Sequence, residues 1–343
     1  MMATNQPTQL TTLPKNSAIM ILGHGSRSPS AIAEFSNMIT QLQKRYSPIL
    51  VEYGFLEFAT PIIRDGLDKL RHQGASHILS VPALLFAAGH AKNDMPSVIN
   101  QYQTDHPTIT ITYGRELSID HRLLKAASES ILSVLPKFLS HDEQKKYMAE
   151  SLLLVVGRGT SDPDANSNMA KVMRFLWEGL GFGWGEVAYS GVTFPLVAPA
   201  LDKIANLPYR RIIVFPYFLF SGILVDRIYQ AVDAAEKKYK TIEFFKAPYL
   251  NDHPQVLDTI TSRINEIVDG MGLMNCQLCK YRQQVLGFED EVGLKQESHH
   301  HHVEGIGNHH HHNHHHHHTG HHPYPFSDHP LGPKTLPSTT EKK

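Results

Sequence analysis

The second half of this chain repeats the first half. A shift of 134 residues places Gly23 on Gly157, Gly25 on Gly159 and Pro61 on Pro195, and this register holds without a gap over about sixty residues. Towards the end of each half the shift becomes 133. A repeat of this length means that one structural unit occurs twice. The chain is therefore expected to fold as two similar lobes.

Each half alternates short apolar runs with helical patterns. The expected strands are Ala18–Leu22, Ile49–Phe55, Ile78–Leu85, Ile109–Tyr113, Leu152–Val156, Val187–Ser190, Arg211–Leu219 and Ile242–Ala247. The expected helices are Ser30–Tyr46, Pro61–Gln73, Asp94–Tyr102, Ile119–Leu135, Asn166–Glu178, Val197–Ala205, Leu224–Tyr239 and Pro254–Val268. Apolar strands without polar alternation, separated by helices, are typical of parallel sheets covered on both faces. We predict an α/β fold of two duplicated lobes, each a mainly parallel four-stranded sheet with helices on both faces.

Composition divides the chain further. Residues 1–16 are polar and are expected to form a disordered arm. The charged segment 140–150 is expected to link a first lobe at 17–139 to a second lobe at 151–270. A short segment at 271–288 carries two cysteines, and hydrophobic periodicity stops near residue 289. The tail at 289–343 is rich in His, Pro, Gly and Ser, so we expect it to be disordered in the absence of metal.

Charge and cysteine content narrow the class of protein. The chain has 32 Lys and Arg against 33 Asp and Glu, so no global basic field would hold nucleic acid or a membrane surface. No apolar run approaches the length of a membrane span, and residues 1–15 lack the pattern of a signal peptide. Only two cysteines occur, which fits a reducing compartment. We expect a soluble cytoplasmic protein.

Three polar residues follow neighbouring strands of the first half. His24 lies in a Gly-His-Gly-Ser-Arg turn, Glu57 follows the second strand, and His90 follows the third. Taken singly, a glycine-rich turn, a capping carboxylate and a structural histidine would explain them. Because the carboxyl ends of parallel strands share one edge of a sheet, the fold should bring the three together. Two imidazoles and a carboxylate suit a divalent first-row metal.

The duplication supplies an internal control for these three residues. At the matching positions the second half has Arg158, Gly191 and Leu224. Residues needed for folding alone would be needed in both halves. We infer one active lobe and one supporting lobe.

Motifs in both halves resemble a known family. GHGSR, FLEFATP and VPALLFAAGH resemble the CbiX family of class II tetrapyrrole chelatases, and VVGRGTSDPDAN, GVTFP and VFPYFLFSGIL resemble its long two-domain form. The resemblance covers about residues 17–279. It implies the insertion of a divalent metal, Co²⁺, into sirohydrochlorin for cobalamin (corrin) biosynthesis. It also implies that His24, Glu57 and His90 are the catalytic residues and metal ligands.

Chemistry adds expectations about substrate binding. Metal insertion removes two pyrrole protons, and His24 with Glu57 as second acceptor could take them. Sirohydrochlorin carries many carboxylates, for which the basic candidates, unranked by the sequence, are Arg27, Lys92, Arg158 and Arg174. Phe86 and the small residues after it would form an apolar wall for the macrocycle. The expected substrate-binding residues are Gly25, Ser26, Arg27, Glu57, Leu85, Phe86, Ala87, Ala88 and Gly89.

The end of the chain holds two further candidate metal sites, and both resemble features of the long family form. Cys276 and Cys279 are candidates for an iron–sulfur cluster, while unmodified thiols, a redox pair and half of a zinc site stay open. A four-thiolate cluster would be shared between two chains and would make a homodimer. Sixteen of the 24 histidines lie between His299 and His329, so the tail is expected to bind Ni²⁺, Co²⁺ or Zn²⁺ as a reservoir.

Three alternative functions stay open. A sirohydrochlorin ferrochelatase of sirohaem synthesis would make similar demands on the same ligands. A nickel or cobalt store or metallochaperone would use the tail, but it requires no asymmetry between the lobes. A phosphate-binding protein would use the Gly-His-Gly-Ser turn, but it leaves Glu57 and His90 unexplained.

Overall fold

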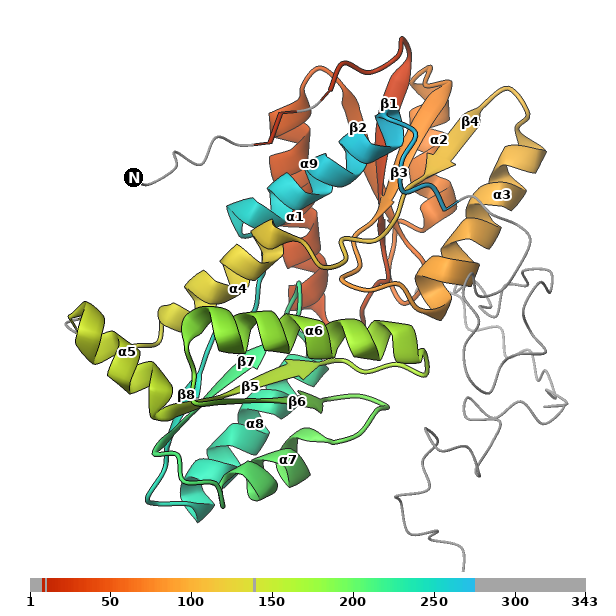
Figure 1. Ribbon diagram of the computed structural model, residues 1–343. Helices are drawn as coiled ribbons and strands as arrows, with labels where there is room; N and C mark the ends of the chain where they lie inside the picture. The colour runs from red at the N-terminus through yellow and green to blue at the C-terminus, as the bar shows by residue number, and fades with distance from the viewer. Residues whose placement is uncertain (1–7, 10, 138–139, 275–343) are drawn as a thin grey trace, which may run out of the picture.

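The computed structural model describes residues 8–9, 11–137 and 140–274, and it contains two parallel β-sheets surrounded by helices (Figure 1). The sheet of the first lobe has the strand order β2-β1-β3-β4. Its strands are β1 (Ser17–Gly23), β2 (Leu50–Phe55), β3 (His77–Pro82) and β4 (Thr110–Tyr113). The accompanying helices are α1 (Pro29–Tyr46), α2 (Ile63–His72), the π-helical turn η1 (His90–Asp94), α3 (Met95–Asp105) and α4 (His121–Leu132).

The second sheet repeats this plan in the order β6-β5-β7-β8. Its strands are β5 (Ser151–Gly157), β6 (Trp184–Tyr189), β7 (Arg211–Pro216) and β8 (Glu243–Lys246). The helices of this half are α5 (His141–Ala149), α6 (Pro163–Leu180), α7 (Val197–Ile204), α8 (Ile223–Lys238) and α9 (Pro254–Val268). In the part of the chain that the structure describes, no helix has the length and apolar content needed to cross a membrane.

The pairing registers of the two sheets agree residue for residue. Ala18 lies opposite Leu50, and Leu152 lies opposite Trp184, which is an offset of 32 in both pairs. The backbone bridge between Phe55 and Ile62 also has its counterpart at positions 189 and 196. The predicted α/β fold of two duplicated lobes with parallel four-stranded sheets is confirmed.

Strand β3 ends earlier than the apolar run Ile78–Leu85 predicts. The amide of Ala83 still donates to the carbonyl of Leu22. The carbonyls of Leu84 and Leu85 instead accept from the amides of residues 117 and 118, which lead into α4. These backbone groups bind a loop and not a neighbouring strand, so residues 83–89 form a loop at the carboxyl edge of the sheet. Strand β7 likewise ends at Pro216, short of Leu219.

The expected linker and the expected disordered arm both contain defined contacts. The linker at 140–150 contains α5, which begins with a capping box in which the Ser140 amide donates to the Glu143 carboxylate over 2.7 Å. In the expected disordered arm, the amide of Thr11 donates to Oδ1 of Asn265 on α9 over 2.9 Å. Leu13 packs against the core. These two contacts hold residues 11–16 against the folded lobes.

Helices α4 and α9 are exchanged between the lobes. Helix α4 follows β4 of the first sheet but packs against β7 and α6 of the second lobe. Helix α9 follows β8 of the second sheet but packs against β3 of the first, and it lies beside α1 in Figure 1. The two helices also contact each other. Division of the chain at 140–150 therefore does not separate the lobes in space.

The exchange creates a single apolar core between the two sheets. This core joins Ile19 and Val81 of the first sheet to Val155 and Phe215 of the second, through side chains of α1, α9, α4 and α6. A second cluster fills the space between the first sheet and helices α2 and α3. A third fills the space between the second sheet and helices α7 and α8. Each sheet is thus covered on both faces, as parallel sheets require.

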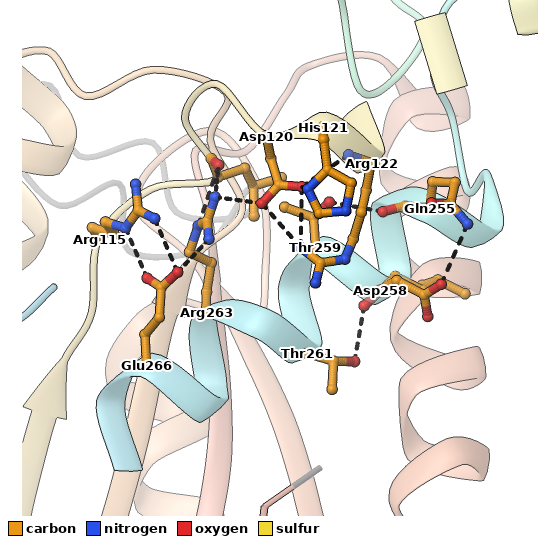
Figure 2. Close-up of polar contacts among 12 residues, drawn as sticks. Arg115, Asp120, His121, Arg122, Gln255, Asp258, Thr259, Thr261, Arg263 and Glu266 are labelled. Carbon is orange, nitrogen blue, oxygen red and sulfur yellow. Dashed lines mark hydrogen bonds and ion pairs between the residues drawn. The ribbon is translucent and has the colours of Figure 1, made fainter. Parts of the chain in front are cut away.

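A buried arginine joins the two exchanged helices (Figure 2). Arg263 of α9 is 2% exposed, and its guanidinium donates to the carbonyls of Glu116 and Leu117. It also pairs with Asp120, the N-cap of α4, at 3.1 Å and with Glu266 at 2.6 Å. Burial alone would raise the pKa of Asp120, but the Arg122 amide and the charges of Arg263 and Arg122 outweigh it and lower the pKa. The carboxylate therefore stays ionised opposite Arg263.

Replacement of this arginine should destabilise the whole fold. Arg263→Met leaves Asp120 partly buried with less compensating charge and removes donors from two carbonyls, so we expect a loss of about 3 kcal/mol in the free energy of unfolding. The matched control is Lys246→Met, which breaks the exposed pair with Asp233 and should cost under about 1 kcal/mol. Urea unfolding followed by circular dichroism measures both. Equal effects of the two variants would contradict this role of Arg263.

Candidate metal centre

The structure brings His24, Glu57 and His90 together at the carboxyl edge of the first sheet. His24 follows β1, Glu57 follows β2, and His90 opens the η1 turn after β3. One ligand atom of each residue lies within 4.8 Å of the others. Within residues 8–9, 11–137 and 140–274, no other group of three or more His, Cys, Asp or Glu residues has this geometry. The strand order explains it, because β1 lies between β2 and β3.

Backbone contacts fix the loop of His24 against the loop of Glu57. The amide of Glu57 donates to the carbonyl of His24 over 3.0 Å, and the amide of Leu56 donates to the carbonyl of Gly23 over 2.9 Å. Gly25 has a φ of +94°, and a Cβ atom there would lie 1.7 Å from the carbonyl oxygen of Glu57. Only glycine permits both this backbone angle and this approach.

The His24 imidazole is a neutral ligand that faces a carboxylate. Its Nδ1 donates to the carbonyl of Gly25 over 3.1 Å, so Nε2 is the nitrogen with the lone pair. Nε2 is buried without a hydrogen-bond partner, although Oε1 of Glu57 is 3.2 Å away. Two electron-pair donors at this distance favour a cation between them. The site therefore fits a divalent metal.

The surroundings of His24 keep it unprotonated. Burial, the neighbouring His90 and the positive charge of Arg158 lower the pKa of His24 to about 4, against the opposing effects of the Gly25 carbonyl and Glu57. A neutral imidazole does not have to lose a proton before it binds a metal.

His90 is oriented by a buried carboxylate that the sequence analysis did not identify. Nδ1 of His90 lies 2.9 Å from Oδ2 of Asp94. Asp94 is 3% exposed, and its other carboxylate oxygen, Oδ1, accepts from the side-chain amide of Asn93. The contact between His90 and Asp94 leaves Nε2 as the nitrogen that can bind a metal, and it fixes the orientation of the ring. The two histidine rings meet edge to face at 4.4 Å. The sequence predicts a helix only from Asp94 onward, so the spacing of four residues between His90 and Asp94 became informative only with the η1 turn.

The structure separates the four basic residues that the sequence left unranked. Arg27 is exposed and lies over the ring of Phe58 at 4.9 Å, next to His24. Arg158 acts electrostatically on both His24 and Glu57 although it belongs to the second lobe.

The other two basic residues are engaged elsewhere. The ammonium group of Lys92 is buried against Asp162 and Asp164. Arg174 pairs with Glu178 on α6. Arg27 and Arg158 are therefore the basic groups placed to meet an anionic ligand at the metal centre.

The predicted apolar wall is only partly open. Leu85 and Phe86 pack against the inner core, and Phe86 stacks on Tyr217 of the second lobe with ring centroids 5.8 Å apart. Ala87 is buried, whereas Ala88 and Gly89 are partly exposed beside His90. Gly25 and Ser26 are partly exposed beside His24. Cys276, Cys279 and the histidines of the tail lie outside the described residues.

The close approach at Gly25 gives a test of this geometry. Gly25→Ala should displace the Glu57 loop and weaken Co²⁺ binding at the three ligands, because the new Cβ would overlap the Glu57 carbonyl. Gly74→Ala is the matched control, since Gly74 has a φ of +89° but no atom within 4 Å of its Cβ position. In both variants, backbone strain at a positive φ should lower the free energy of unfolding by about 1–2 kcal/mol.

The measurement is the visible absorption of bound Co²⁺, taken as the difference from His90→Ala so that the histidine tail cancels. Unchanged Co²⁺ binding in folded Gly25→Ala would show that this contact does not position the ligands.

Comparison with known proteins extends over both lobes. The sequence matches the CbiX family at residues 18–134 and 152–267. The sirohydrochlorin cobaltochelatase of Priestia megaterium is 31% identical over 270 residues, which are 78% of this chain and 86% of that protein. The sirohydrochlorin ferrochelatase of the same organism is 27% identical over 255 residues, 74% of this chain and 92% of that protein.

A solved structure agrees with these matches. SirB from Bacillus subtilis with Fe³⁺ has a TM-score of 0.65 at 25% identity and covers 75% of this chain and 99% of its own. The motifs in both halves thus carry a resemblance that the comparisons confirm. Because the family match covers both lobes, the chain belongs to the CbiX family.

Proposed function

We propose that this protein inserts Co²⁺ into sirohydrochlorin for cobalamin biosynthesis. The observation that carries the proposal is the convergence of His24, Glu57 and His90 within 4.8 Å in a chain of the CbiX family. The cobaltochelatase of Priestia megaterium, at 31% identity, supports cobalt as the metal substrate. The reducing compartment indicated by only two cysteines suits a cytoplasmic reaction.

The reaction exchanges one metal ion for two protons. Co²⁺ replaces the two pyrrole N–H protons of sirohydrochlorin, so the site must deliver the metal and accept protons. His24 and His90 supply two neutral nitrogens that hold the ion without neutralising it, and Glu57 supplies one carboxylate. We assign proton acceptance to His24 and Glu57, whose Nε2 and Oε1 lie 3.2 Å apart at the site where the macrocycle must release its protons.

The supporting lobe would bind the macrocycle. Arg158 lies where the first lobe has His24, and its positive charge reaches the metal centre. Val192 and Ile223, which follow β6 and β7 at the carboxyl edge of the second sheet, are 60% and 64% exposed. A guanidinium and exposed apolar side chains on one edge of a sheet suit a flat ring that carries carboxylates. Arg27 would serve the same carboxylates from the first lobe.

The second candidate function is iron insertion into the same macrocycle. The ferrochelatase of Priestia megaterium covers 74% of this chain at 27% identity, close to the value for the cobaltochelatase. The purified protein should be mixed with sirohydrochlorin and with Co²⁺, Fe²⁺ or Ni²⁺ separately, and the absorbance change of metallation followed. The fastest acceleration over the uncatalysed rate should occur with Co²⁺. If no metal is inserted faster than in the uncatalysed reaction, the enzymatic function is contradicted, and metal storage is the function that stays open.

Substitution of the ligands tests the active lobe. His24→Ala and His90→Ala should each nearly abolish metallation without loss of fold, because both side chains are partly exposed at the sheet edge, His24 in a loop and His90 at the start of η1. Glu57→Ala should be severe but less complete. The matched control is Leu224→His in the second lobe, which should create no activity, since Arg158 and Gly191 offer no companion ligands. A wild-type rate in either histidine variant would contradict the assignment.

The segments after residue 274 add proposals that rest on the sequence. We propose that the histidine-rich tail is a local metal reservoir, and that Cys276 and Cys279 contribute to an iron–sulfur cluster shared between two chains. Truncation after Val292 should lower the number of Co²⁺ ions bound per chain several-fold but preserve metallation at saturating Co²⁺. Equilibrium dialysis and the metallation assay measure the two effects. A folded, truncated protein that is inactive in excess Co²⁺ would show that the tail belongs to the active site.

A further inference from the structure

A buried ion pair joins the turn that carries His90 to the second lobe. Lys92 is 5% exposed, and its Nζ lies 2.7 Å from Oδ2 of Asp162 and 3.0 Å from Oδ2 of Asp164. Asp162 is 4% exposed and is the N-cap of α6, where its other oxygen accepts from the amide of Asp164 over 3.0 Å. The acceptor carboxylate is therefore itself held in place by the helix.

The η1 turn connects this ion pair to the metal centre. Residues two apart on a helical turn project to different sides, whereas residues four apart share one side. His90 and Asp94 contact each other on one side, while Lys92 reaches the second lobe on the other. The turn is π-helical, a form that occurs often at functional sites.

The loops of His24 and Glu57 are held to each other by the backbone hydrogen bonds that end β1 and β2. The position of His90 relative to them therefore depends on where the η1 turn is anchored. Through Lys92, this turn is attached to Asp162 of the second lobe.

The duplication again supplies an internal control. At the shift of 134, Lys92 corresponds to Asp226, and Asp162 and Asp164 correspond to Ser28 and Ser30. On that side of the molecule, Oγ of Ser221 donates to Oγ of Ser30 over 3.0 Å, and the amide of Ser221 donates to a carboxylate oxygen of Glu34 over 2.7 Å. In the part of the chain that the structure describes, a buried lysine–aspartate pair thus joins the lobes on the side whose turn carries a metal ligand.

We propose that Lys92, held by Asp162 and Asp164, is a positioning residue that anchors the His90 turn to the second lobe and so sets the distance of His90 from His24 and Glu57. The inference rests on the proposed function, because it assigns these three residues to one metal. It gives the supporting lobe a part in the metal centre although that lobe supplies no ligand.

The test uses the full-length chain and steady-state metallation of sirohydrochlorin by Co²⁺. Lys92→Met should raise the KM for Co²⁺ and lower kcat, with a combined loss of about ten- to a hundredfold, while the KM for sirohydrochlorin stays unchanged. Lys92→Arg should recover most of this loss, because a guanidinium can bind both carboxylates. Lys238→Met is the matched control, since it breaks the exposed pair with Asp202 within the second lobe and should change nothing.

A second variant separates positioning from stability. Lys92→Met leaves Asp162 buried without its cation, which lowers the melting temperature. Lys92→Met combined with Asp162→Asn removes that unpaired charge and keeps an N-cap side chain, so it should recover thermal stability but not the KM for Co²⁺. Recovery of both would show a purely structural ion pair and overturn the proposal. Wild-type kinetics in Lys92→Met would overturn it as well.

A further readout distinguishes failure of this inference from failure of the proposed function. Visible absorption of Co²⁺, taken as the difference between each chain and its His90→Ala variant, reports binding at the three ligands without sirohydrochlorin. If the wild-type chain binds Co²⁺ there but metallates nothing, the proposed function fails, and weaker binding in Lys92→Met still supports the anchor. If the wild-type chain shows no such binding, both proposals fall.

Discussion

Helices α4 and α9 each leave the sheet that precedes them in the chain and pack against the sheet of the other lobe. Their exchange places one continuous apolar core between the two sheets, so neither lobe can separate without exposing that core to water. Arg263 lies where the two helices meet, with its donors on the carbonyls before α4 and its charge on Asp120 and Glu266. The fixed relation of the two carboxyl edges follows from this packing. Contacts such as Lys92 with Asp162 depend on it.

Two factors position the ligands of the metal centre and set their charge: the close approach of two backbone loops and the electrostatic surroundings of the side chains. Gly25 lets the first loop touch the carbonyl of Glu57, and that contact brings the imidazole of His24 to the carboxylate. Burial and a nearby guanidinium keep His24 neutral, while Asp94 orients His90. A site with two neutral ligands and one carboxylate holds a divalent ion with residual positive charge. Such an ion can still pass to a macrocycle that offers nitrogens of its own.

The two copies have diverged in chemistry and kept their geometry. Their strand order and registers agree, and glycines with positive φ occur at both 25 and 159. The first copy holds the ligands. The second places Arg158 at the position of His24 and two aspartates at the positions of Ser28 and Ser30. Substitutions at a few loop positions were sufficient because the scaffold beneath both carboxyl edges stayed the same.

The amino-acid sequence by itself determined the duplication, the parallel sheets and the convergence of His24, Glu57 and His90. These follow from a repeat, from apolar runs and from the shared edge of parallel strands, all of which are local patterns. Other features involve residues far apart in the sequence, such as Lys92 with Asp162, Arg263 with Asp120 and Phe86 with Tyr217. No local pattern pairs a lysine with one aspartate among many. Only the exchange of α4 and α9, driven by burial of the shared core, decided which charged groups of the two lobes meet.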